Sequence, residues 1–204
     1  MKKIVPLTAL MGLTLVFGSC STSKDSLATA DNEAYATGKE NTASCFIQKK
    51  DGSIIRYQSL RLVNSVFNSA YLLADGSTRI YGNDIRSYQT RDYFAVSQAQ
   101  FVNGRKSHVS TECLPGFAVR IARGKLNVYC KKFYNGSRAV NEYYLQQGED
   151  GKIQVYSAGV FLEMIKENAA ATAFFTNGHK MPLMKKIQGT AAIINAAAPD
   201  VTKN

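Results

Sequence analysis

Residues 117–130 read FAVRIARGKLNVYC, and this stretch decides the fold class. Arg123 and Gly124 separate two runs rich in β-branched and aromatic residues, so a tight turn between paired strands is expected. A two-residue loop would pair Ile121 with Leu126, Val119 with Val128 and Phe117 with Cys130. These six residues then share one apolar face, and the opposite face carries Ala118, Arg120, Asn127 and Tyr129. We therefore predict an antiparallel hairpin here.

The same punctuation recurs along the chain. Short runs rich in Val, Ile, Tyr and Phe are separated by the turn dipeptides Asp51-Gly52, Asp75-Gly76, Asn103-Gly104, Asn135-Gly136 and Asp150-Gly151. A two-residue loop at Asp75-Gly76 would place Tyr71, Leu73, Thr78 and Ile80 on one face, with Leu72, Arg79 and Tyr81 opposite. The pattern predicts an antiparallel β-rich meander, as a sheet, a sandwich or a small barrel, over residues 43–157.

After Ser157 the apolar spacing becomes helical. Phe161, Met164 and Ile165 predict a first helix that Asn168 ends, and residues 169–175 (AAATAFF) predict a second. Pro182 suits the first turn of a last helix, whose apolar stripe is Leu183, Ile187, Ala191 and Ile194. The expected fold is α+β, with a helical part over 158–198 packed on the sheet.

The N-terminus has the layout of a signal peptide over residues 1–19. Lys2 and Lys3 precede an apolar run from Ile4 to Phe17, and the small pair Gly18 and Ser19 follows. As a helix this run would span about 21 Å, whereas a bilayer core is about 30 Å thick. A permanent transmembrane anchor is therefore not expected.

Gly18, Ser19 and Cys20 resemble the lipobox of bacterial lipoproteins, although Phe17 stands where that class usually has Leu, Val or Ile. The resemblance implies cleavage between Ser19 and Cys20 and acylation of Cys20, for example with palmitate. Ordinary secretory cleavage, which would leave Cys20 a plain thiol, is the alternative. Residues 21–42 are small and polar, so residues 20–42 are expected to form a flexible, lipid-anchored tether. The expected location is the outer membrane, on either its periplasmic or its surface side.

Three stretches of the body resemble small uncharacterised lipoproteins of Bacteroidetes: YQTRDYFAV (88–96), LPGFAVRI (114–121) and NEYYLQQGEDGKI (141–153). This resemblance supplies no functional residue. It supports the envelope location and leaves the molecular function open.

No motif in the chain predicts catalysis, a cofactor or a metal. Cys45, Cys113 and Cys130 lack the close spacing of zinc or redox sites, and Cys130 is expected to be buried in the apolar face of the hairpin. One disulfide among the three is possible in an oxidising envelope, with the pairing left open. His108 and His179 have no second ligand nearby in sequence and are expected to be exposed.

The basic charge leaves a second class of function open. The formal net charge of +10 falls to +8 when Lys2 and Lys3 leave with the signal peptide. An anionic ligand or glycolipid could bind if the pairs Lys49-Lys50, Lys131-Lys132 and Lys185-Lys186 converge. Nucleic acid is a poor candidate in the envelope.

The sequence therefore favours a non-enzymatic, membrane-anchored envelope lipoprotein that presents a β-rich domain to an envelope protein partner. The alternatives are the anionic-ligand module and an enzyme assembled from Glu112, Glu142, His108 or His179.

Overall fold

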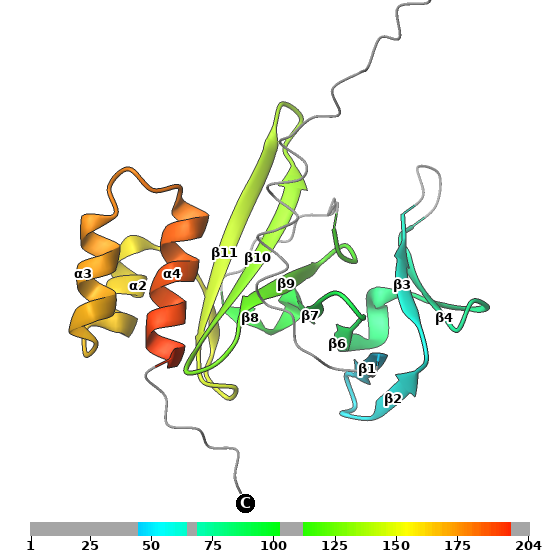
Figure 1. Cartoon of the computed structure of the whole chain (residues 1–204). Helices are drawn as coiled ribbons and strands as arrows, with labels where there is room; N and C mark the ends of the chain where they lie inside the picture. Colours follow the sequence, from blue (N-terminus) through cyan, green and yellow to red (C-terminus); the bar gives the residue numbers. More distant parts are fainter. Residues whose placement is uncertain (1–44, 65–68, 103–111, 197–204) are drawn as a thin grey trace, which may run out of the picture.

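The computed structural model describes residues 45–64, 69–102 and 112–196. Within these ranges a curled nine-stranded sheet, a separate three-stranded sheet and three C-terminal helices form an α+β fold (Figure 1). The predicted fold class is confirmed. Cys20 and His108 lie outside the described residues, as do the predicted signal peptide and tether.

The elements follow one another along the chain. The strands are β1 (Cys45–Lys49), β2 (Ile54–Tyr57), β3 (Leu60–Val63), β4 (Tyr71–Ala74), β5 (Thr78–Ile80), β6 (Ile85–Gln89), β7 (Phe94–Ser97), β8 (Phe101–Val102), β9 (Phe117–Ala122), β10 (Leu126–Tyr134), β11 (Ala139–Gln147) and β12 (Ile153–Val155). The α-helices are α2 (Ala158–Ile165), α3 (Ala169–Asn177) and α4 (Leu183–Ala196), and the short 3-10 helices are η1 (Gly82–Asp84) and η2 (Gln98–Gln100).

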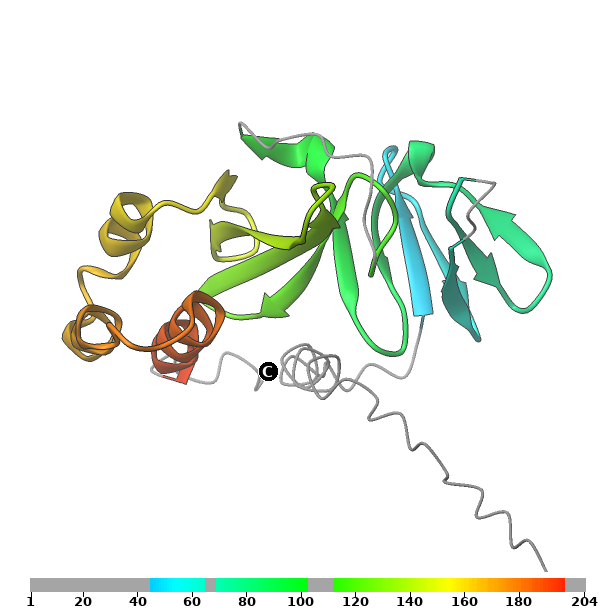
Figure 2. The same ribbon diagram turned by 90° about the horizontal axis from the view of Figure 1, so that it is seen from above.

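The large sheet runs in the order β2-β1-β6-β7-β9-β10-β11-β12-β8, and the small sheet in the order β3-β4-β5. Every described pairing is antiparallel except that of β12 with β8, which is parallel. Figure 2 shows the helices at one end of the large sheet and the small sheet at the other. One end of the molecule is therefore a helix-on-sheet arrangement, and the other end contains two sheets.

The structure contains the predicted hairpin over 117–130, with the expected residues on each face. The predicted register of its two strands is wrong. Cys130 lies opposite Val119 and not opposite Phe117, and a bulge interrupts the ladder between Val128 and Tyr129. The loop between β9 and β10 has three residues, not two. A bulge adds a residue to one strand, so the two changes together shift the pairing and still keep alternate residues on their expected faces.

Asn195 near the end of α4 explains the longer loop. Its side chain accepts a hydrogen bond from Leu126 N and donates to the carbonyl oxygens of Arg123 and Leu126, at 2.9–3.1 Å. A Cβ on Gly124 would lie 2.5 Å from the Asn195 side chain, at a φ of +147° that favours glycine. The turn is therefore shaped by a helix some seventy residues further along the chain.

The prediction for the turn at Asp75-Gly76 is wrong by one residue. Ala74 pairs with Thr78, and Leu72 pairs with Ile80, so Ile80 shares a face with Leu72. The loop contains Ser77 as well, and both Asp75 and Gly76 have positive φ. Because strand side chains alternate, a one-residue change in loop length exchanges the two faces.

Three clusters of buried side chains fill the molecule. The first lies beneath β1, β4, β6 and the start of β9, and it contains Cys45, Leu72, Tyr88, Cys113 and Phe117 among others. The second joins β9, β10 and β11 to the three helices through residues such as Val128, Leu145, Phe161, Phe175 and Ile187. The third lies on the opposite face of β10 and β11 and includes Phe101, Tyr129 and Tyr144.

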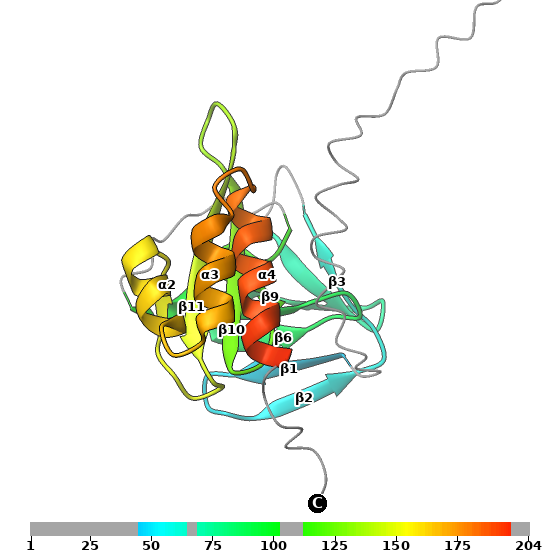
Figure 3. The same ribbon diagram turned by 60° about the vertical axis from the view of Figure 1, so that its left-hand side comes forward.

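The helices form as the sequence predicts, with one reassigned residue. The Ser157 side chain caps α2, whereas Asn168, expected to end the first helix, caps the start of α3 by accepting from Ala171 N at 2.9 Å. In Figure 3, α3 and α4 cover β10 and β11. Gly189 of α4 lies so close to the Phe174 ring that an added Cβ would be 2.6 Å from it. No helix within the described ranges is long and apolar enough to cross a membrane.

Candidate functional site

Two adjoining cavities lie where α2 meets the end of the β11–β12 hairpin. The larger has a volume of about 520 Å³ and is lined by Gln147, Gln154, Gly159, Val160, Glu163, Met164, Lys166 and Glu167. The other, of about 350 Å³, is lined by Lys125, Leu126, Gln147, Met164, Ile165, Glu167, Asn168 and Ile194. They share Gln147, Met164 and Glu167, so we treat them as one feature, the α2 groove.

The local sequence explains why α2 leaves a groove. Phe161 and Ile165 are four residues apart and fully buried, which holds one stripe of the helix against the core. Val160 and Met164 lie beside that stripe and are only partly buried. With eight residues, α2 is too short to cover the end of the sheet completely. Partly buried apolar side chains therefore line the groove.

The turn that borders the groove is held from inside the sheet. Gln146 donates to the carbonyl oxygens of Glu149 and Gly151 at 2.8 and 2.9 Å, and Asn127 donates to that of Gly148 at 2.7 Å. These buried amides satisfy backbone groups of the turn and so fix its position. The sheet side of the groove is therefore preorganised.

The rim of the groove is polar and mainly acidic on its helix side. Glu163 forms an ion pair with Lys166 one turn later, and this hydrogen bond raises the pKa of the Lys166 ammonium. Glu167 has no ion pair among the described residues. The groove can therefore accept an apolar side chain against Val160 and Met164 and a cationic group beside Glu167.

A second polar feature lies inside the large sheet, away from the groove. Lys131 is fully buried and donates to Gln98 Oε1; Gln98 donates to the Tyr144 hydroxyl at 2.7 Å, which donates to Glu142 at 3.0 Å. Burial lowers the pKa of Lys131, and the nearby Glu142 carboxylate opposes that shift. Burial also raises the pKa of Tyr144, and the Glu142 carboxylate adds to that shift.

Of the four residues considered for catalysis, His108 lies outside the described residues, and the other three are not brought together. Glu142 belongs to the Lys131 network, and Glu112 forms an ion pair with Lys132 at 3.0 Å. Lys131 and Lys132 are consecutive in β10, so their side chains leave opposite faces of the strand. His179 is exposed in the connection between α3 and α4, far from β10 in sequence and on the helical side of the molecule (Figure 1). Both carboxylates serve as counter-ions to adjacent lysines.

The cysteines form no disulfide with one another, and the lysine pairs lie on separate elements. All three cysteines are buried: Cys45 and Cys113 lie in the first cluster, and Cys130 lies in the apolar second cluster as expected. In the described ranges no three His, Cys, Asp or Glu side chains gather as a metal site. The lysine pairs fall on three separate elements, at the end of β1, within β10 and at the start of α4. These three elements lie apart in Figure 1, and Lys131 is buried.

Comparison with protein-family models, with curated proteins and with solved structures returned no match. The interpretation of the site therefore depends on its geometry. Sequence reasoning identified Met164 only as part of a helix and missed Gln147, Gln154 and Glu167. The spacing of these residues in the sequence does not indicate a groove, because the groove forms only where the ends of β11, α2 and α4 meet.

Proposed function

We propose that this chain is a non-enzymatic, membrane-anchored envelope lipoprotein that presents a β-rich interaction domain to a protein partner. The observation that carries the proposal is the α2 groove, whose apolar lining and charged rim suit a protein segment. The anchor in this proposal is acylated Cys20, and the location is the outer membrane.

The groove suits one kind of partner segment. An aliphatic side chain would lie against Val160 and Met164, and a Lys or Arg would lie beside Glu167. Interfaces combine an apolar centre with a polar rim in this way, and a few side chains usually supply most of the binding energy. Since the sheet side of the groove is fixed by Gln146 and Asn127, binding requires little ordering there.

Site-specific photo-crosslinking in intact bacteria tests this interaction. A photoreactive residue at Glu163, on the groove rim, should give a reproducible crosslink to an envelope protein. The same residue at Thr176, exposed on α3, should not. Met164→Lys places a charge in the apolar lining and should reduce the crosslink at least about tenfold. Leu162→Lys, the same change on the exposed side of α2, is the matched control and should preserve it.

Equal crosslinking at Glu163 and Thr176, or equal effects of Met164→Lys and Leu162→Lys, would exclude the groove as the contact. The anchor is tested separately, by the mass of the N-terminal peptide from native membranes. We expect Cys20 with its acyl chains. An unmodified N-terminus near that position would make the protein periplasmic or secreted, and would leave the groove test intact.

A further inference from the structure

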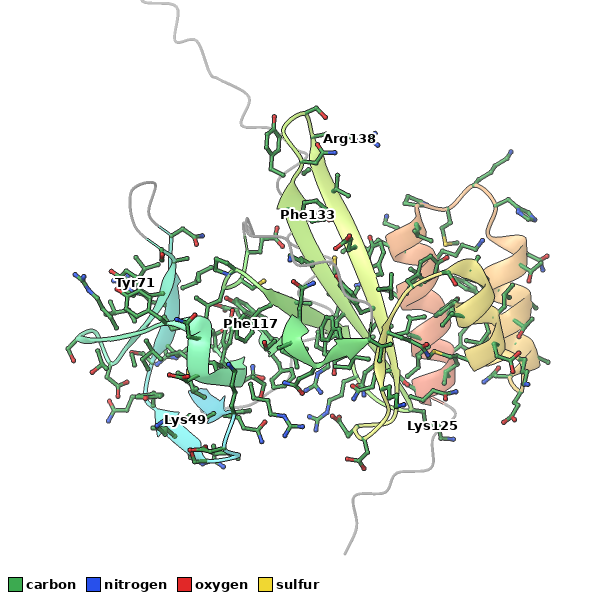
Figure 4. The ribbon with its side chains drawn as sticks, turned by 180° about the vertical axis from the view of Figure 1, so that it is seen from behind. Lys49, Tyr71, Phe117, Lys125, Phe133 and Arg138 are labelled. Atoms are coloured by element: carbon green, nitrogen blue, oxygen red, sulfur yellow. The ribbon has the colours of Figure 1, made fainter. Side chains whose placement is uncertain are left out.

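The β10–β11 hairpin ends in a tip that projects from the body of the protein. Residues 134–139 are six consecutive exposed residues. In Figures 1, 3 and 4 this end of the hairpin extends beyond the helices and the small sheet. The tip can therefore reach a flat surface before the rest of the domain meets it.

The hairpin is hydrogen-bonded up to its end. Its strands pair without a break from Leu126 and Gln147 to Tyr134 and Ala139. The Asn135 side chain then accepts hydrogen bonds from Ser137 N, Ser137 Oγ and Arg138 N at 3.0–3.1 Å, and Asn135 N donates to Arg138 O. Since the turn is already ordered, contact at the tip costs little conformational entropy.

The tip combines an exposed aromatic ring with positive charge. Tyr134 is 53% exposed, although aromatic side chains are usually better covered. Phe133 and Val140 form a partly buried cross-strand pair just below it, and Arg138 is exposed beside the turn. No acidic residue occurs from Lys132 to Asn141. Tyrosine and arginine are the residues that membrane interfaces favour, for ring placement and for contact with anionic headgroups.

We propose that this tip inserts Tyr134 into the headgroup region of an anionic lipid bilayer, with Arg138 against the lipid phosphates. A projecting, narrow hairpin suits a planar surface, and its charge complements anionic lipid. The α2 groove includes Gln147, at the other end of β11. Eight residue steps of strand separate Gln147 from the tip, or about 27 Å. Contact at the tip would therefore hold the groove away from the bilayer.

This inference goes beyond the proposed function and needs neither the groove nor the Cys20 anchor. The experiment uses the absence of tryptophan from the chain. In the full chain, Tyr134→Trp provides a single reporter at the tip. Tyr81→Trp, at another exposed tyrosine (49%) beside β5, is the matched control. Each variant is mixed with vesicles of phosphatidylcholine alone or with phosphatidylglycerol added.

With anionic vesicles, the Tyr134→Trp emission should move to shorter wavelength and be quenched by brominated lipid, and the Tyr81→Trp emission should not. Adding Arg138→Glu should raise the lipid concentration for half-maximal shift at least about fivefold, as should high salt, because each cationic side chain adds roughly that factor near an anionic surface. Circular dichroism checks that the variants fold. Equal emission from both reporters would overturn the proposal, as would a Tyr134→Trp shift that ignores lipid charge.

Discussion

Near the body of the protein, both faces of the β10–β11 hairpin are buried, but they are built from different chemistry. On the helix side, Val128, Cys130 and Leu145 pack against Phe161, Phe175 and the rest of the second cluster. On the other side, Asn127, Tyr129, Lys131, Tyr144 and Gln146 are buried and linked by hydrogen bonds. The same two strands thus contact an apolar core on one face and a polar core on the other.

The difference shows what each face contributes. Apolar burial is non-directional and depends on area and fit, so the helices can cover the first face with modest geometric demands. A buried polar group is costly unless its partner is in place, so the second face tolerates only one arrangement. That face orders the β11–β12 turn beside the groove, and it makes its residues sensitive to substitution and to pH.

Phe161→Ala should produce the largest effect, on the apolar side. Phe161 is fully buried, with its ring 4.7 Å from that of Phe175 and 5.8 Å from that of Tyr156. Losing the ring and leaving a cavity should lower the free energy of unfolding by about 3–5 kcal/mol in urea denaturation. Leu162→Ala, at an exposed position in the same helix, should change it by less than about 0.5 kcal/mol. Similar values for the two would mean that α2 does not hold the helices on the sheet.

This comparison also shows how far the sequence could lead. Alternation along 117–130 predicted which residues share each face, because period two is a local property of a strand. It failed on register, because a bulge shifts the pairing and because the three-residue loop is held by Asn195 of α4, far away in sequence. The turn at Asp75-Gly76 failed similarly, since one more loop residue exchanges the faces.

The polar face was harder to predict than the fold. The pattern placed Asn127 and Tyr129 opposite the apolar face but did not predict that both are buried. The curl of the sheet brings η2 and β8 over that face, and nothing local to 126–134 encodes that contact. Of the groove, the sequence could predict the helix but not the cavity beneath it.

Lys131→Met tests the polar side directly. The substitution keeps a long side chain but leaves the buried Gln98 oxygen without this donor and removes the cation beside Glu142. We expect the free energy of unfolding to fall by about 1–3 kcal/mol. The double variant with Gln98→Leu should recover part of that loss, because the deserted acceptor is then gone. If Lys131→Met alone stabilises the protein, the desolvation of the buried ammonium outweighs the stabilisation by its hydrogen bond. The polar face would then not depend on Lys131 for its stability.

High pH should separate the two faces by the smallest and most selective effect. Burial raises the pKa of Tyr144 above its ordinary value of about 10, so above pH 10 the unfolded chain loses this proton while the folded protein keeps it. The unfolded state then binds fewer protons, and stability falls as pH rises, by up to about 1.4 kcal/mol per pH unit for this tyrosine. Between pH 10 and 11.5, Tyr144→Phe should therefore remove the part of the stability loss that Tyr144 causes. At neutral pH the same substitution should lower the free energy of unfolding by about 1 kcal/mol, because the hydroxyl's hydrogen bonds are lost.

Tyr156→Phe is the matched change on the helix side. The Tyr156 hydroxyl makes no hydrogen bond to the described residues. Tyr156 is only partly buried, so burial raises its pKa by less than it raises the pKa of Tyr144. Neutral-pH stability should therefore hold within about 0.5 kcal/mol, and the alkaline slope should change less than in Tyr144→Phe. Equal slopes in the two variants would show that Tyr144 ionises as freely as a half-exposed tyrosine. The polar side of the hairpin would then open to water before the protein unfolds, and the contrast between the two faces would be one of dynamics as well as chemistry.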